Sequence, residues 1–147
     1  MSEGKAGVPI EPVRRSVTVS WNVASAFQRF TAQIASWWPL RSHSVSGEQA
    51  VSCVFEQHVG GKIYEVARDG ARSEWGTVLV WDPPGRVEFT WHPGSGPEVA
   101  SRVELRFSAV AGGTRLDLTH TGWEVFGRNA QKMRRGYNVG WVYVLNL

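Results

Sequence analysis

The sequence predicts an α+β fold in which a curved, seven-stranded antiparallel sheet packs against a long C-terminal helix. An alternating segment at residues 15–21 gives way to helical periodicity from Asn22. Six more strand-like segments follow in series, separated by glycine and proline turns. After Trp123 the apolar period is again helical and continues to the C-terminus. This order indicates one sheet with helices after its first and last strands.

The first strand is expected at residues 15–21, where two valines and Trp21 alternate with serine and threonine. Asn22 is a suitable helix cap. In the helix that it begins, apolar residues recur at three- and four-residue steps: Val23, Ala26, Phe27, Phe30 and Ile34. We expect this helix to run to about Trp37 and to stop before Pro39, because a proline displaces the preceding residue from helical geometry.

Turn residues divide the centre of the chain into six strands. After a polar connection at residues 40–49, we expect strands at residues 50–58, 61–68, 74–81, 86–92, 98–108 and 114–121. Short turns between successive strands imply antiparallel neighbours. The 98–108 segment alternates most clearly, with Val103, Leu105 and Phe107 set against Arg102, Glu104 and Arg106. One face of the sheet is therefore expected to be apolar and the other solvated.

The C-terminal helix carries one apolar stripe, formed by Met133, Tyr137, Gly140, Trp141 and Val144. Gly136 and Gly140 each lower helix propensity by about 1 kcal/mol relative to alanine, so packing must hold this helix in place. A sheet with one apolar face needs a cover, and this helix is long enough to supply it. A strongly curved sheet gripping a helix is also expected to leave a pocket that side chains do not fill.

Composition excludes several classes of protein. The 147 residues fit one domain, expected at residues 12–147 after a flexible tail at residues 1–11, and eight Trp, six Phe and three Tyr supply a large core. A net charge of +3 with scattered cations argues against nucleic-acid binding. The single cysteine, Cys53, allows no internal disulfide and is expected to be an inert buried thiol.

The sequence also predicts where the protein is located and whether it binds a metal. The sequence begins without a signal peptide and has no stretch of about 18 apolar residues, so a cytoplasmic protein without a membrane span is expected. His43, His58 and His92 lie in loops or at strand ends, without the spacing of metal ligands. Neither a metal nor another cofactor is expected.

Five segments resemble the successive motifs of a known family: AFQRFTAQIASWWP, GGKIYEVARDG, EWGTVLVWDPPGRVEFTW, GGTRLDLTHTGW and GWVYVL. Their order and spacing are similar to those of the bacterial heat-shock protein 90 ATPase activator-like family, in the START-like (SRPBCC) superfamily. The resemblance covers about residues 13–147. It implies the helix-grip fold and a hydrophobic cavity between the sheet and the C-terminal helix. That fold hosts lipid carriers, polyketide cyclases and aromatases, hormone receptors, stress-linked binding proteins and co-chaperone domains.

Two polar residues are candidates for chemistry. Alternation leaves open whether Glu65 points inward or lies in a solvent-facing ion pair, although the motif of the resembled family places a glutamate there. His120 shares the face of Leu116 and Leu118, as either a ligand contact or a satisfied core histidine. If both point inward, Glu65 and His120 form the one plausible acid–base pair of the chain.

The leading interpretation is a binding protein for a small hydrophobic or aromatic molecule. The expected ligand-binding residues are Trp38, Glu65, Trp75, Phe89, Trp91, His120, Met133, Tyr137 and Trp141. The polar loop at residues 41–47 is expected to act as a gate beside Trp38. One alternative is a cyclase, aromatase or hydrolase that uses Glu65 and His120. A chaperone-interaction module is less favoured, because the sequence has no separate N-terminal domain like that of the eukaryotic co-chaperone. A homodimer is left open.

Overall fold

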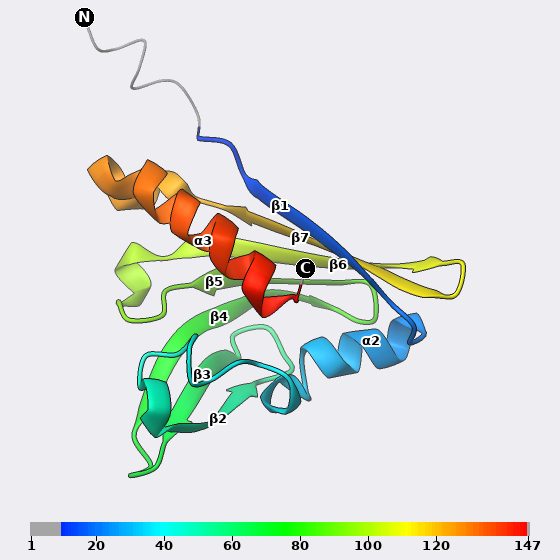
Figure 1. The fold of residues 1–147 in the computed structure, drawn as a ribbon, viewed down its shortest axis with the longest axis horizontal. Helices are drawn as coiled ribbons and strands as arrows, with labels where there is room; N and C mark the ends of the chain where they lie inside the picture. Colours follow the sequence, from blue (N-terminus) through cyan, green and yellow to red (C-terminus); the bar gives the residue numbers. More distant parts are fainter. Residues whose placement is uncertain (1–9, 147) are drawn as a thin grey trace, which may run out of the picture.

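Seven antiparallel strands form one curled sheet in a computed structural model that describes residues 10–146 (Figure 1). The strands are β1 Val13–Val19, β2 Ala50–Phe55, β3 Lys62–Ala67, β4 Arg72–Asp82, β5 Arg86–Trp91, β6 Ser101–Val110 and β7 Gly113–Thr121. Their order across the sheet is β1-β7-β6-β5-β4-β3-β2, so only β1 joins out of sequence. The predicted tail at residues 1–11 lies almost entirely outside the described residues.

Two α-helices and four 3₁₀ segments complete the fold within residues 10–146. The α-helices are α2 Val23–Phe30 and α3 Ala130–Val144, and the 3₁₀ segments are η1 Ile34–Ser36, η2 Gly47–Gln49, η3 Pro97–Val99 and η4 Trp123–Asn129. Figure 1 shows α3 crossing the sheet diagonally, with α2 near one end of the strands. The predicted helix-grip α+β architecture is therefore confirmed. No helix within residues 10–146 combines the length and apolar character that crossing a bilayer requires.

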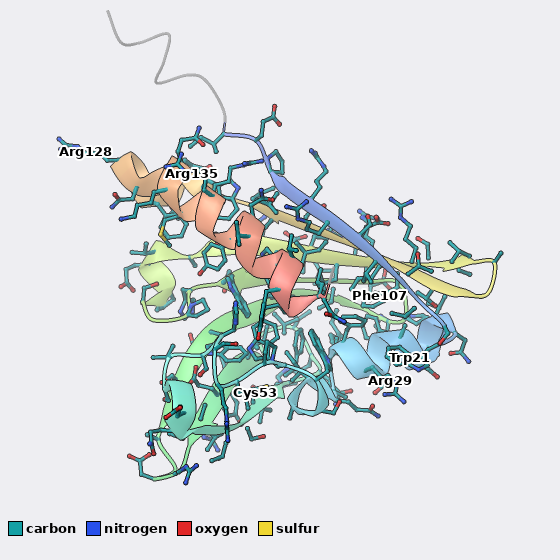
Figure 2. All side chains as sticks on the ribbon, viewed as in Figure 1. Trp21, Arg29, Cys53, Phe107, Arg128 and Arg135 are labelled. Atoms are coloured by element: carbon teal, nitrogen blue, oxygen red, sulfur yellow. The ribbon has the colours of Figure 1, made fainter. Side chains whose placement is uncertain are left out.

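The core lies between the sheet and these helices. On β6 the predicted alternation is confirmed, because Val103, Leu105 and Phe107 are buried whereas Arg102 and Arg106 are exposed. Phe107 also contacts α2, with its ring 5.2 Å from that of Phe27 (Figure 2). Aromatic pairs of this kind add to the stability gained from apolar burial.

The first helix is shorter than predicted. The Asn22 side chain caps it by accepting a hydrogen bond from the Ser25 amide at 2.8 Å, but it ends at Phe30 and not at Trp37. Thr31 leaves helical geometry, and its hydroxyl donates to the Phe27 carbonyl oxygen at 2.7 Å. The Thr31 amide donates to the same carbonyl at 3.1 Å, and this β-branched residue, a weak helix former, ends the helix before Pro39 is reached.

Two strand boundaries differ from prediction by three residues, and the others by no more than two. The sixth strand begins at Ser101 and not at residue 98, because Pro97 starts a 3₁₀ turn and has no amide hydrogen to give to a sheet. The second strand ends at Phe55, and a register shift between Ala50 and Ser52 leaves Val51 exposed. Neither change alters the order of the sheet.

Candidate functional site

A pocket of about 400 Å³ opens between α3, the loop after η1 and the turn after β5. Its walls are mostly apolar and consist of Trp38, Ser42, His43, Ser44, Val45, Trp91, Pro93, Gly94, Tyr137, Gly140, Trp141 and Val144. Deeper between the sheet and α3, side chains leave only about 20 Å³. The interior under the helix is therefore filled, and the usable space lies at its mouth. We call this space the mouth pocket.

Helix α3 supplies one wall of the mouth pocket. Tyr137, Gly140, Trp141 and Val144 lie three, four and seven residues apart and so share one helical face. A Cβ atom placed on Gly140 would meet no neighbouring atom within 4 Å, so the bare backbone there adds to the open space. Small residues on this stripe thus keep the wall recessed.

Tyr137 brings the one phenol to this wall. Its hydroxyl has no hydrogen-bond partner in the part of the chain that the structure describes. Burial raises the pKa of Tyr137, so the phenol keeps its proton at neutral pH. It can therefore donate a hydrogen bond to a polar atom in the pocket.

Three indoles form the back wall. The ring centroid of Trp38 lies 5.8 Å from that of Trp91 and 6.1 Å from that of Trp141, and Trp91 and Trp141 are 5.8 Å apart. Trp75 packs behind them, 5.1 Å from Trp38 and 5.6 Å from Trp91. The indole N–H of Trp38 donates to the His43 carbonyl oxygen at 2.7 Å. Its polar edge is thus occupied, and ring surface remains to meet a ligand.

The loop wall is held from inside by Glu65. This carboxylate is fully buried, which settles the direction that alternation left open. It accepts hydrogen bonds from the amides of Val45 and Ser46 at 2.6 and 2.8 Å and from the Trp75 indole at 2.7 Å. Both oxygens therefore bind protein donors. The predicted gate is anchored by Glu65 and by the Trp38–His43 hydrogen bond.

His120 is the second predicted polar contact, and it is a satisfied core residue. The Trp141 indole donates to Nδ1 at 2.9 Å, so Nε2 holds the ring proton and donates to Ser101 Oγ at 2.6 Å. The Ser101 hydroxyl in turn donates to the Trp91 carbonyl oxygen at 3.2 Å. Burial lowers the pKa of His120 to about 3, so the ring is neutral. It supports Trp141 from behind.

The predicted site residues therefore separate into two groups. Trp38, Trp91, Tyr137 and Trp141 line the mouth pocket. The others lie behind or beside it: Glu65, Trp75, Phe89, His120 and Met133. Glu65 and His120 both point inward but share no hydrogen bond, and each is occupied by other protein groups. The structure does not bring them together as an acid–base pair at the pocket.

Some lining residues were not singled out by the sequence. The sequence predicted only a turn at Pro93 and Gly94, and it placed Val144 at the end of the apolar stripe of the helix. Cys53, on β2 in Figure 2, is buried, and burial followed by the nearby Glu65 charge raises the pKa of its thiol to about 12. This agrees with an inert thiol. Within residues 10–146 no three histidine, cysteine or acidic side chains group as metal ligands would.

The curled sheet, the gripped helix and the mouth pocket define a helix-grip protein with space for a small molecule. Residues 22–146 match the family model described as "Activator of Hsp90 ATPase homolog 1-like protein". The chain belongs to this family. No curated protein matches it.

Solved structures agree with this assignment. The anthrahydroquino-γ-pyrone synthase Txn09 is 36% identical, with 88% of each chain covered and a TM-score of 0.61. Protein MLL2253 from Mesorhizobium loti is 18% identical, with 92% of each chain covered and a TM-score of 0.67. CalU16 from Micromonospora echinospora is 21% identical, with 92% of this chain and 71% of that one covered and a TM-score of 0.61. The last two share the fold alone.

Proposed function

We propose that the protein binds a small, flat aromatic molecule in the mouth pocket. Three indole rings and a phenol face this space from fixed elements, and aromatic faces favour stacking with flat ring systems. A volume of about 400 Å³ is within the usual range for small-molecule sites. The 36% identity to Txn09, a protein named for an anthrahydroquinone product, supports a multi-ring aromatic ligand.

The bare backbone at Gly140 is the observation that carries this proposal. Packing would favour a larger residue on a helix that covers a core, and glycine costs about 1 kcal/mol of helix propensity relative to alanine. Here it opens the pocket wall between Tyr137 and Trp141. Filling this position should block the ligand without disturbing the fold.

Gly140→Leu tests the proposal directly, with Gly136→Leu as a matched control. Gly136 also lies on α3 with nothing within 4 Å of an added Cβ, but it does not line the pocket. The probe is chrysazin, a three-ring anthraquinone whose two hydroxyls lie beside one carbonyl. Its binding is followed by quenching of tryptophan fluorescence, since three tryptophans line the site.

We expect Gly140→Leu to weaken chrysazin binding by about tenfold or more, and Gly136→Leu to leave it within about twofold. The reason is steric, because a leucine side chain occupies the space of one ring. Equal affinities in the two variants, or no quenching of the wild type, would contradict binding at this pocket.

A second candidate function is ring closure on the bound aromatic, favoured by the synthase name of Txn09. Mass analysis of an anthrahydroquinone ligand after incubation separates the two functions. An unchanged mass and chromatographic retention time support binding alone, whereas loss of water, or a new retention time at the same mass, supports catalysis. Interaction with a chaperone and formation of a homodimer stay predictions.

A further inference from the structure

A polar cleft lies directly beside the mouth pocket. It encloses about 550 Å³ and is lined on one side by Lys62, Glu74 and His92. Val45 and Gly94 line both hollows. The mouth pocket and the polar cleft therefore adjoin at these two residues.

One lining residue of the polar cleft is a buried histidine, His92, which no sequence pattern singled out. The His92 side chain is 1% exposed, and its Nε2 atom lies 3.1 Å from Glu74 Oε2. No hydrogen bond joins these two atoms, and Nε2 has no hydrogen-bond partner within residues 10–146. Its Nδ1 atom lies 3.1 Å from the Ser95 carbonyl oxygen and donates to it. This hydrogen bond fixes the ring with Nε2 facing Glu74, where a second ring proton would bind the carboxylate.

Glu74 is the member of this pair that a ligand can reach, because its side chain is 36% exposed. Its other oxygen lies 3.7 Å from Lys62 Nζ, which also donates to Thr77 Oγ1 at 2.9 Å. The carboxylate thus lies between an imidazole and an ammonium group. Such a carboxylate can accept a hydrogen bond from a ligand hydroxyl. The ammonium group can at the same time donate a hydrogen bond to the oxygen atom of that hydroxyl.

We infer that the mouth pocket and the polar cleft form one composite site for a hydroxylated aromatic molecule. The rings lie among the indoles, and a hydroxyl at the end of the ring system crosses the edge at Val45 and Gly94 to donate to Glu74. This inference rests on the proposed function and adds the class of ligand. His92 is a positioning residue, because it acts on the ligand only through Glu74.

Two isomeric anthraquinones test the composite site. Anthraflavic acid has one hydroxyl at each end of its ring system. Chrysazin has the same atoms, but both its hydroxyls donate internally to the neighbouring carbonyl. The two isomers are titrated in mildly acidic buffer, where the phenols keep their protons, against the wild type, Glu74→Gln and Glu124→Gln. Glu124 is exposed in η4, lines neither hollow and matches the change of charge.

We expect Glu74→Gln to weaken anthraflavic acid binding by about tenfold and to leave chrysazin within about twofold, since only the first ligand reaches the carboxylate. Glu124→Gln should change neither. His92→Gln should repeat the selective loss, whereas a purely structural role would lower the affinity for both isomers.

Three outcomes would overturn the composite site. If Glu74→Gln weakens both isomers equally, the residue shapes the pocket and does not contact the hydroxyl. If it weakens neither, the polar cleft does not take part in binding, although the proposed function stands. If the wild type binds neither isomer, the proposed function fails together with this inference.

Discussion

The space under α3 and the mouth pocket share three indole walls but differ about twentyfold in volume, at about 20 and 400 Å³. Trp38, Trp91 and Trp141 line both regions. Under the helix they meet bulky apolar side chains from β6 and β7, such as Leu105 and Leu118. At the mouth they meet two glycines and a loop. The partners of an aromatic wall, and not the wall itself, decide whether it becomes core or binding site.

The sharpest test of this contrast is a truncation in the filled region. Leu118 is 1% exposed and lines the small gap under α3. Leu118→Ala should lower the free energy of unfolding by about 3 kcal/mol, because it loses apolar burial and enlarges a cavity. Urea unfolding measures the loss.

Binding should respond differently to this truncation. Chrysazin affinity of the folded Leu118→Ala protein is expected to stay within about twofold of wild type, since Leu118 does not line the mouth. A tenfold loss of affinity without loss of stability would reverse the roles that we assign to the two regions.

The next largest effect on stability is expected from Glu65, which anchors the loop wall of the mouth pocket from inside. Glu65→Gln puts an amide NH₂ group where the carboxylate accepts hydrogen bonds from Val45, Ser46 and Trp75, so at least one donor loses its partner. The free energy of unfolding should fall by about 2 kcal/mol. The amides of Val45 and Ser46 should also exchange hydrogen faster, because the loop wall is released.

Glu48→Gln is the control for this variant, because Glu48 is exposed in the neighbouring η2 turn. It should change neither stability nor exchange. Unchanged exchange in Glu65→Gln would mean that the loop is held by other contacts. Loss of catalytic turnover without loss of stability would instead restore Glu65 as a functional acid.

The smallest expected effect is a dependence of stability on pH that originates behind the pocket. Burial lowers the pKa of His120 from 6.5 to about 3, so the unfolded chain takes up a proton below about pH 6.5 that the folded chain refuses. Stability contributed by this site is complete above that range and falls as pH decreases. The loss between about pH 7 and about pH 5.5 should be about 1 kcal/mol.

Urea unfolding at the two pH values, compared between wild type and His120→Gln, measures this loss. The variant should lack it, whereas His58→Gln, at an exposed histidine, should keep it. An identical pH dependence in all three proteins would show that His120 is not the residue that titrates.

Much of the fold follows from local patterns in the sequence. Alternation on β6 and the stripe on α3 are properties of residues two or four positions apart, and both are present as predicted. The predicted end of α2 was wrong, because the backbone leaves helical geometry at the β-branched Thr31 although the apolar period continues to Ile34. The spacing of apolar residues thus predicts where a helix lies better than it predicts the residue at which the helix ends.

The candidate site was only partly predictable, because it depends on contacts between distant segments. The aromatic stripe led to Tyr137 and Trp141, which do line the pocket. Glu65 pairs with backbone amides some 20 residues away, and period two cannot reveal which face an isolated strand buries. His92 read as the residue before a turn, and its contact with Glu74 arises only when β4 pairs with β5.

Gly140 also has a consequence for how the binding pocket would evolve. A single-base change in a glycine codon can give alanine, and the added Cβ atom would meet no neighbouring atom within 4 Å. Such a step would also favour the helix. Ligand size would therefore be adjusted at one position at no cost to folding, and homologues with different ligands are expected to differ there first.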